Sequence, residues 1–416
     1  MRSCCNKAKT ARETDPCHPP EPACCSAPAA TEAPGADRPM AWFRDMVGHC
    51  HEYACTEKQK GRKLVGILCE FTPREIIMAA GAMPVCLCGG DADKIPAAER
   101  DLPSTLCPLI KSTYGYSVEK ANPFLEMADL LVAETTCDGK KKMYELLARR
   151  HPMHVLELPQ KPDDPDAFEH WVCELRKLRD ELRRRFGAPI SDDDLRAAIA
   201  QMNRERSLKR QLAELMKAKA PPLTGRELLD MKSLIACMPA DLECYERALL
   251  TLPGRQAAPD LGSRMRVLLT GVPLPHGAER VMDIIESHGG LVVCQENCTG
   301  LKPVLEDVQA DAPDPLRAIA EKYFHLPCSV MTRNDRRLDS LRRLAREYRA
   351  DCVIELVWQA CLTYDIESFE VKRLVEDELN LPYLRIGTDY SPSDSTRIAL
   401  RVQALFETAG NRGKLL

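Results

Sequence analysis

The chain has 416 residues, 44% hydrophobic and 29% charged, which is enough for two or three domains with sizeable cores. Its 58 basic and 62 acidic residues nearly balance, which argues against a nucleic-acid surface or a polybasic membrane anchor. No run of about 18 apolar residues could cross a bilayer, and no apolar signal segment opens the sequence. We therefore expect a cytoplasmic protein with small-molecule or protein partners.

The chain contains 20 cysteines, although disulfides are rare in the cytoplasm. So many thiols favour metal or redox chemistry over a disulfide framework. Residues 1–38 are rich in Pro, Ala and polar groups without an apolar period, so we expect a disordered tail there. Its cysteines are interpreted as incidental thiols, with loose metal binding as the alternative: Cys4, Cys5, Cys17, Cys24 and Cys25.

Residues 39–187 and 261–416 each alternate short apolar runs with helix-length stretches, which is the pattern of an α/β domain. The segment between them, 188–260, keeps apolar residues at helical spacing after a Ser cap and an acidic first turn, and predicts a helical domain. In the first α/β domain we expect strands at 63–71, 128–137 and 153–159. In the second we expect strands at 265–271, 290–296, 352–358 and 383–389.

Six cysteines stand where a strand or short loop is followed by a helix or turn: Cys69, Cys107, Cys137, Cys298, Cys328 and Cys361. Open α/β sheets assemble their sites at the carboxyl ends of strands, so these thiols are expected to meet in one cleft between the two halves. A helix N-terminus favours the thiolate by lowering its pKa. For any single cysteine, a small buried apolar residue is the alternative.

The spacing of the cysteines does not match a known local metal motif. Twice-repeated C-x2-C pairs would indicate structural zinc, and C-x2-C-x2-C-x3-C would indicate a ferredoxin cluster, but neither pattern occurs. Ligands scattered between residues 69 and 361 would have to be brought together by folding, which places any metal centre at a domain interface.

Several segments between about residue 40 and about residue 407 resemble the 2-hydroxyacyl-CoA dehydratase / benzoyl-CoA reductase superfamily, and more narrowly its double-cubane-cluster branch. The resemblance is carried by CEFTPREIIMAAGAMPV, LCPLIKSTYG, ETTCDGKKKMYELL, LLTGVPLPHGAERVMDIIESHGG, ENCTG, QACLTYDIES and PYLRIGTDYSPSD. It implies two Rossmann-like domains with short parallel sheets, a helical segment and a cluster at the interdomain cleft.

The resemblance also implies a ligand set. The cysteines that match the single [4Fe-4S] cluster of the dehydratase branch are Cys69, Cys107 and Cys361. The double-cubane branch adds a second cubane through a bridging sulfide, [8Fe-9S], and its ligands correspond to Cys137, Cys298 and Cys328. Cys88 or Cys294 could replace one member of this second group.

Two segments depart from the family pattern. Val272 occupies the place of the cysteine in a frequent T-G-C-P motif, so no ligand is expected there. Gly387 begins a closing motif that commonly starts with glutamate and ends D-x-G-Q, which puts substrate contacts from this loop in doubt.

The resemblance implies a homodimeric iron-sulfur reductase that takes low-potential electrons from a separate ATPase carrying its own [4Fe-4S] cluster. The chain has no G-x-x-x-x-G-K-[ST] loop, so ATP would be bound by the partner. One alternative is a subunit of a 2-hydroxyacyl-CoA dehydratase or aromatic acyl-CoA reductase with one [4Fe-4S] cluster. The other is a cysteine-rich cluster carrier without catalysis.

Charged and aromatic residues near these cysteines are given ordinary structural interpretations. Lys140, Lys141 and Lys142 are interpreted as a solvated helix face rather than a docking site. Glu134 and Glu296 are interpreted as polar strand ends rather than proton relays. For Tyr114 and Tyr364, packing is favoured over a place in the pocket.

Overall fold

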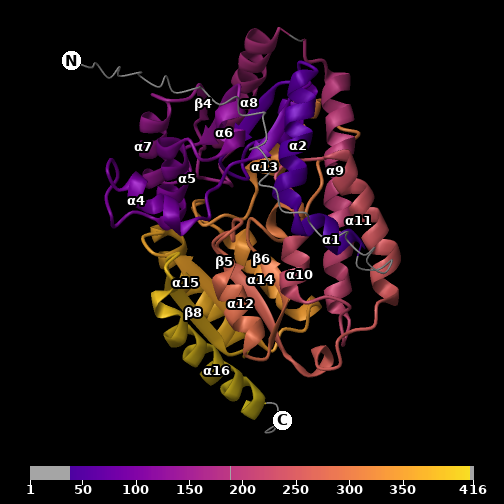
Figure 1. The fold of residues 1–416 in the computed structure, drawn as a ribbon, viewed down its shortest axis with the longest axis vertical. Helices are drawn as coiled ribbons and strands as arrows, with labels where there is room; N and C mark the ends of the chain where they lie inside the picture. Colours follow the sequence, from indigo (N-terminus) through magenta and orange to yellow (C-terminus); the bar gives the residue numbers. More distant parts are fainter. Residues whose placement is uncertain (1–37, 188, 413–416) are drawn as a thin grey trace, which may run out of the picture.

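The computed structural model describes residues 38–187 and 189–412. The tail expected at residues 1–38 lies outside the described residues apart from Arg38, with which helix α1 begins. The cysteines of that tail are therefore outside them as well. Figure 1 shows most elements of the first half (indigo to purple) above most of those of the second half (orange to yellow).

The first half contains a parallel four-stranded sheet in the order β2-β1-β3-β4. Its strands are β1 (Leu64–Ile67), β2 (Met83–Cys86), β3 (Leu130–Glu134) and β4 (Met153–Leu156). Its helices are α1 (Arg38–Arg44), α2 (Met46–Gln59), α3 (Arg74–Ala79), α4 (Ile95–Ala98), α5 (Pro108–Glu119), α6 (Pro123–Met127), α7 (Asp138–Leu147) and α8 (Pro165–Phe186).

The second half contains another parallel four-stranded sheet, in the order β6-β5-β7-β8. Its strands are β5 (Met265–Gly271), β6 (Gly290–Glu296), β7 (Cys352–Trp358) and β8 (Tyr383–Thr388). Its helices are α12 (Arg280–Ser287), α13 (Pro315–Phe324), α14 (Asp335–Glu347), α15 (Leu362–Arg373) and α16 (Ser395–Arg412). The expected α/β class with two Rossmann-like sheets is confirmed.

Strand β2 was not expected from the sequence. Pro84 lies within it, and proline lacks the N–H that a central strand needs, so it is tolerated here because β2 is an edge strand. The free edge is covered by the chain before α11: Cys86 N–H donates to Leu234 O at 2.8 Å, and Ala236 N–H to Pro84 O at 3.2 Å. The helical segment is thus bonded to the first sheet.

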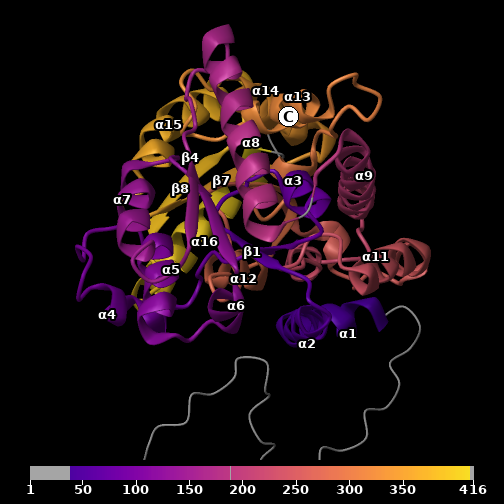
Figure 2. The same cartoon turned by 90° about the horizontal axis from the view of Figure 1, so that it is seen from above.

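Between α8 and the second sheet, the described residues form three α-helices: α9 (Asp192–Glu214), α10 (Gly225–Asp230) and α11 (Pro239–Thr251). Helix α9 starts with a capping box, in which Ser191 and Asp194 bond each other's backbone N–H groups. It packs against α3 and α13, so it contacts both halves. Figure 2 shows α9 and α11 on the same side of the two sheets.

The two halves share one continuous core. A single cluster of buried apolar side chains contains Leu64 and Leu131 of the first sheet together with Leu269 and Ile354 of the second. Because these side chains pack in one cluster, the carboxyl ends of the two sheets are held in a fixed relation to each other.

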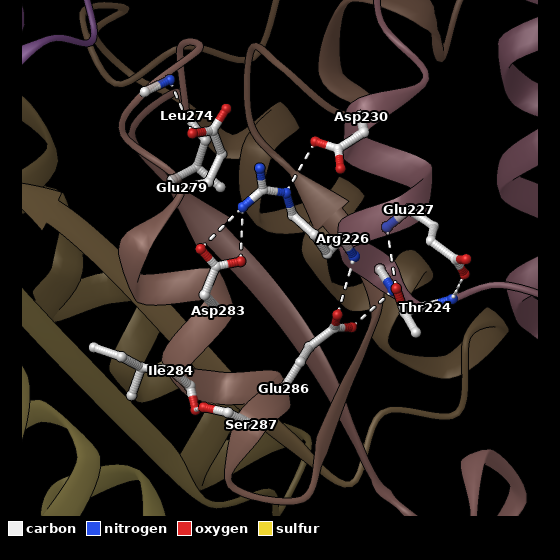
Figure 3. Close-up of polar contacts among 12 residues, drawn as sticks. Thr224, Arg226, Glu227, Asp230, Leu274, Glu279, Asp283, Ile284, Glu286 and Ser287 are labelled. Carbon is white, nitrogen blue, oxygen red and sulfur yellow. Dashed lines mark hydrogen bonds and ion pairs between the residues drawn. The ribbon is translucent and has the colours of Figure 1, made fainter. Parts of the chain in front are cut away.

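Helix α10 is fastened to α12 by a charged network (Figure 3). Arg226 donates to Asp283 at 2.7 and 2.9 Å and to Asp230 at 2.9 Å. Glu286 accepts the backbone N–H groups of Gly225 at 2.7 Å and Arg226 at 3.1 Å, which are free donors at the start of α10.

Replacing Arg226 with alanine is expected to lower the free energy of unfolding by about 1 kcal/mol, since the pairs are partly solvent-screened. Arg204→Ala serves as the matched control, because Arg204 makes one exposed pair with Glu246. Urea unfolding of both variants measures the difference. If both variants lose the same free energy of unfolding, the ion pairs between α10 and α12 contribute no more to stability than an ordinary exposed pair.

Candidate metal centre

A cavity of about 850 Å³ lies where the two sheets and α9 meet, and all six predicted cysteines line it. Among residues 38–187 and 189–412, the cysteines in its lining are Cys69, Cys86, Cys88, Cys107, Cys137, Cys294, Cys298, Cys328 and Cys361. The structure therefore brings the six together, as the spacing argument expected. It also adds three others: Cys88 and Cys294, which were kept as alternatives, and Cys86.

Four of the six cysteines closely follow the carboxyl ends of strands. Cys69 follows β1, Cys137 follows β3, Cys298 follows β6 and Cys361 follows β7, each by two or three residues. The carboxyl ends of neighbouring parallel strands lie at the same edge of a sheet, so each sheet delivers two thiols to its edge.

Three of the six are the N-cap residues of helices: Cys107 of α5, Cys137 of α7 and Cys361 of α15. Cys69 is not an N-cap: it lies in the turn between β1 and α3, and the N-cap of α3 is Pro73. Cys328 lies in the loop after α13 and is 9% exposed.

The lowering of thiol pKa values expected at helix N-termini is wrong for Cys107 and Cys361, the N-caps of α5 and α15. Burial raises the pKa of Cys69 and of Cys361 to about 12, and it raises the pKa of Cys107 and Cys298 as well. Burial outweighs the favourable field of a helix N-terminus because it removes the solvation of the thiolate. A metal that binds here must therefore displace protons.

The thiols also affect one another. Burial is the largest cause of the raised pKa of Cys361, and charges at Cys107, Cys137 and Cys328 add to it. Burial is likewise the largest cause for Cys298, and charges at Cys328 and Cys69 add to it. Charge at Cys328 also raises the pKa of Cys69, after burial, so Cys328 acts on thiols that follow strands of both sheets. Negative charge on all six would need compensation by bound cations.

Lys140 was interpreted as part of a solvated face, and this is wrong. Its Nζ donates to the carbonyl oxygen of Leu68 at 2.7 Å, and the side chain lines the cavity. Burial has the largest single effect on its pKa and lowers it, whereas charges at Cys69, Cys88 and Cys137 raise it. The net result is a raised pKa. Lys141 pairs with Asp138 and Lys142 pairs with Glu145, both on the solvent-exposed side of α7, so for these two lysines the interpretation holds.

A second ammonium group approaches the thiols from the other half. Lys302 is 3% exposed, donates to the hydroxyl of Tyr364 at 2.7 Å and lies 3.2 Å from Glu296 Oε1. Charges at Cys298 and Cys328 help to keep its pKa raised. Tyr364 lines the cavity, whereas Tyr114 is in the core with its hydroxyl on Asp101 at 2.8 Å.

Glu296 belongs to a buried ionic network centred on Arg337, which is 0% exposed. Arg337 donates to Glu296 at 3.3 Å, to Glu355 at 3.0 Å and to Thr270 at 2.9 Å, and it also pairs with Glu367. No sequence signal distinguished Arg337, because it is one of several arginines on the amphipathic helix α14. The network holds the ends of β5, β6 and β7 behind the turn of Cys298.

Glu134 differs from a simple polar strand end. It is fully buried, accepts a short hydrogen bond from Thr72 Oγ1, and burial raises its pKa to about 7. The charge of nearby Lys140 acts in the opposite direction. Glu134 thus supports the turn that carries Cys69.

The thiols do not form a site for one metal ion: among residues 38–187 and 189–412, no group of three or more His, Cys, Asp or Glu could hold one. In an iron-sulfur cubane each thiolate binds a different iron atom, so the ligands surround a larger object. The same part of the chain has no helix long and apolar enough to cross a bilayer.

The fold and the site together define a class of protein. It is an α/β protein in which thiols from two parallel sheets line one cavity. The family model for the 2-hydroxyglutaryl-CoA dehydratase D-component matches residues 69–409. The chain therefore belongs to this family, within the 2-hydroxyacyl-CoA dehydratase / benzoyl-CoA reductase superfamily, as the motifs indicated.

Three relatives illustrate the range of similarity. The putative dehydratase subunit YjiM of Escherichia coli (strain K12) is 42% identical over 355 residues, covering 84% of this chain and 92% of its own. The (R)-phenyllactyl-CoA dehydratase beta subunit of Clostridium sporogenes is 20% identical, covering 88% and 97%. One of the benzoyl-CoA reductase subunits of Thauera aromatica is 22% identical, covering 84% and 90%.

Proposed function

We propose that the chain is an iron-sulfur reductase with a double-cubane [8Fe-9S] cluster in this cavity. It would accept low-potential electrons from an ATP-hydrolysing partner that carries its own [4Fe-4S] cluster, and reduce a small molecule. The observation that carries the proposal is that six thiols from both halves line one cavity of about 850 Å³.

The residues present fit such a group. Thiolates are the usual ligands of iron-sulfur clusters, and the lining offers nine cysteines. Cys69, Cys107 and Cys361 would hold one cubane and Cys137, Cys298 and Cys328 the other, with Cys88 or Cys294 as alternatives in the second set. The bound cluster would supply single electrons at low potential.

The chain itself would stabilise the negative charge of six thiolates. Lys140 and Lys302 bring ammonium groups to the thiols from opposite halves, and backbone N–H groups of Leu109, Ile110 and Tyr364 point toward Cys107 and Cys361. Hydrogen bonds and charges around the sulfur ligands tune the potential of such a centre.

The partner and the assembly follow from the family resemblance. The sequence has no phosphate-binding loop of the G-x-x-x-x-G-K-[ST] type, so ATP hydrolysis is assigned to a separate activator ATPase. We expect a homodimer in the cytoplasm. Both are predictions that size measurement and cell fractionation can check.

A second candidate is a subunit of a 2-hydroxyacyl-CoA dehydratase, or of an aromatic acyl-CoA reductase, with a single [4Fe-4S] cluster. It is favoured by the similarity to the (R)-phenyllactyl-CoA dehydratase beta subunit along 88% of this chain. A lyase of this kind would leave Cys137, Cys298 and Cys328 without iron. A cluster carrier without catalysis is the third possibility.

Iron and acid-labile sulfide counts after anaerobic purification separate the three. We expect about eight irons per chain for the double cubane, about four for the dehydratase subunit, and little or labile iron for a carrier. A stable count near four would overturn the proposal in favour of the second candidate.

A further inference from the structure

One wall of the cavity carries a set of buried charges that the thiol site does not use. Helices α3 and α9 and the turn before α3 contribute three neighbouring ion pairs. The pairs are Arg74 with Glu70 at 2.9 Å, Arg206 with Glu75 at 2.5 Å, and Lys209 with Glu205. Each cation in this set therefore has its own carboxylate.

Lys322 of α13 lies against this set and has no carboxylate of its own. Its side chain is 7% exposed, and its Nζ donates to the carbonyl oxygen of Pro303 at 2.9 Å. Among residues 38–187 and 189–412, no carboxylate lies within ion-pair distance of this ammonium group. Lys322 lines the cavity.

The charge of Lys322 is unfavourable in the protein alone. Burial, the largest cause, and the neighbouring positive charge of Arg206 lower its pKa to about 7. The charge of Arg74 also lowers this pKa, whereas the carboxylates of Glu75 and Glu70 raise it. A buried ammonium group without a counter-ion lowers stability, and a bound anion would remove that cost.

The other charged residues that line the cavity are also mostly cations. Seven cationic residues and three carboxylate residues contribute to the lining, although the whole chain has a net charge of -4. The cations are Arg74, Lys140, Lys141, Arg206, Lys209, Lys232 and Lys322, and the carboxylates are Glu70, Asp138 and Glu205. Burial also lowers the pKa of Lys232, whose carboxylate Glu279 is 3.3 Å away.

Apolar side chains also line the cavity, among them Leu212 and Ala213 of α9, Leu229 of α10 and Val293 of β6. A cavity that combines apolar walls with one convergent charge is typical of a site for a small organic ion. The ion pair of Arg226 with Asp283 in Figure 3 joins α10, which carries Leu229, to α12.

We propose that Lys322 binds the anionic group of a small substrate, a carboxylate or a phosphate, within the cavity. This inference rests on the proposed function and makes it more specific: the small molecule that is reduced would carry a negative charge. The ammonium group contacts the carbonyl oxygen of Pro303 and lies 4.3 Å from the centre of the Tyr323 ring, and the anion would add the charge-assisted hydrogen bond that it lacks. The apolar side chains would enclose the remainder of the molecule.

The test is calorimetric titration of anaerobically purified full-length protein with propionate, inorganic phosphate and coenzyme A in separate arms. Wild type is compared with Lys322→Met and with Lys372→Met, a control at an exposed lysine of α15 that pairs with Glu376. We expect propionate or phosphate to bind wild type and the control alike, and to bind Lys322→Met about ten-fold or more weakly.

The arms separate the sources of the anion. Tight binding of propionate indicates a free carboxylic acid, whereas binding of phosphate and coenzyme A indicates the phosphate of a thioester carrier. No binding to wild type, or equal binding to Lys322→Met, overturns the inference. Iron counts on the same samples test the proposed function independently of these results.

Stability gives a second readout for the same variant. Lys322→Met removes an uncompensated buried charge while keeping most of the side-chain volume, so it is expected to raise the midpoint of thermal unfolding without added anion. A variant that is more stable yet no longer binds the anion supports the proposal. A lower midpoint in the absence of anion would contradict the account of Lys322.

Discussion

Replacing Cys137 with serine is expected to reduce the iron content of the anaerobically purified protein to about half. Cys137 is the N-cap of α7 and, in the proposed ligand set, one of three thiolates that hold the second cubane. A serine hydroxyl is a far weaker iron ligand than a thiolate, so that cubane should not be retained. Iron and sulfide are measured per chain, after size exclusion.

The matched control is Cys173→Ser, at an exposed cysteine of α8 that does not line the cavity. Its iron content should equal that of wild type. Unchanged iron in Cys137→Ser would remove Cys137 from the ligand set. Cys88→Ser and Cys294→Ser would then identify the cysteine that takes its place.

Replacing Arg337 with methionine is expected to lower the free energy of unfolding by about 3–5 kcal/mol, because the change leaves buried carboxylates unpaired. Glu296 would keep Lys302 at 3.2 Å, whereas Glu355 would lose its guanidinium partner and keep the hydroxyl of Tyr383 at 2.6 Å. The three carboxylates that Arg337 bridges come from β6, β7 and α15, so the effect should reach the turn of Cys298.

The control for Arg337→Met is Arg336→Met, one residue away on the exposed side of α14. It should change stability by less than about 0.5 kcal/mol. Orphaned buried carboxylates have raised pKa values and become neutral as the pH falls, so the deficit of Arg337→Met should shrink toward acid pH. A loss below about 1 kcal/mol at neutral pH would contradict the role of this network.

The general arrangement could be predicted because it rests on local patterns. Seven of the eight strands in the described part of the chain were expected from apolar runs. The gathering of thiols such as Cys69 and Cys298 followed from the rule that parallel strands end at one edge. Strand β2 was missed because Pro84 interrupts its short apolar run, and only its place at the sheet edge makes that proline acceptable.

The charges around the site could not be predicted in the same way. Lys140 looked like one of three solvated lysines, and only the position of Leu68 O in the folded chain turns it toward the thiols. Arg337 and Lys322 occur in helices with other basic residues, and their burial depends on what α13 and α14 pack against. Thiol pKa values were expected to be lowered because helix position is visible in a sequence, whereas burial is not.

The most direct test of the central claim is an anomalous diffraction map, collected at the iron edge from crystals grown without oxygen. The account predicts iron peaks in two groups inside the cavity, between the thiols of the first sheet and those of the second. Iron peaks outside the cavity, or none beside these six sulfur atoms in a protein that retains iron in solution, would contradict it.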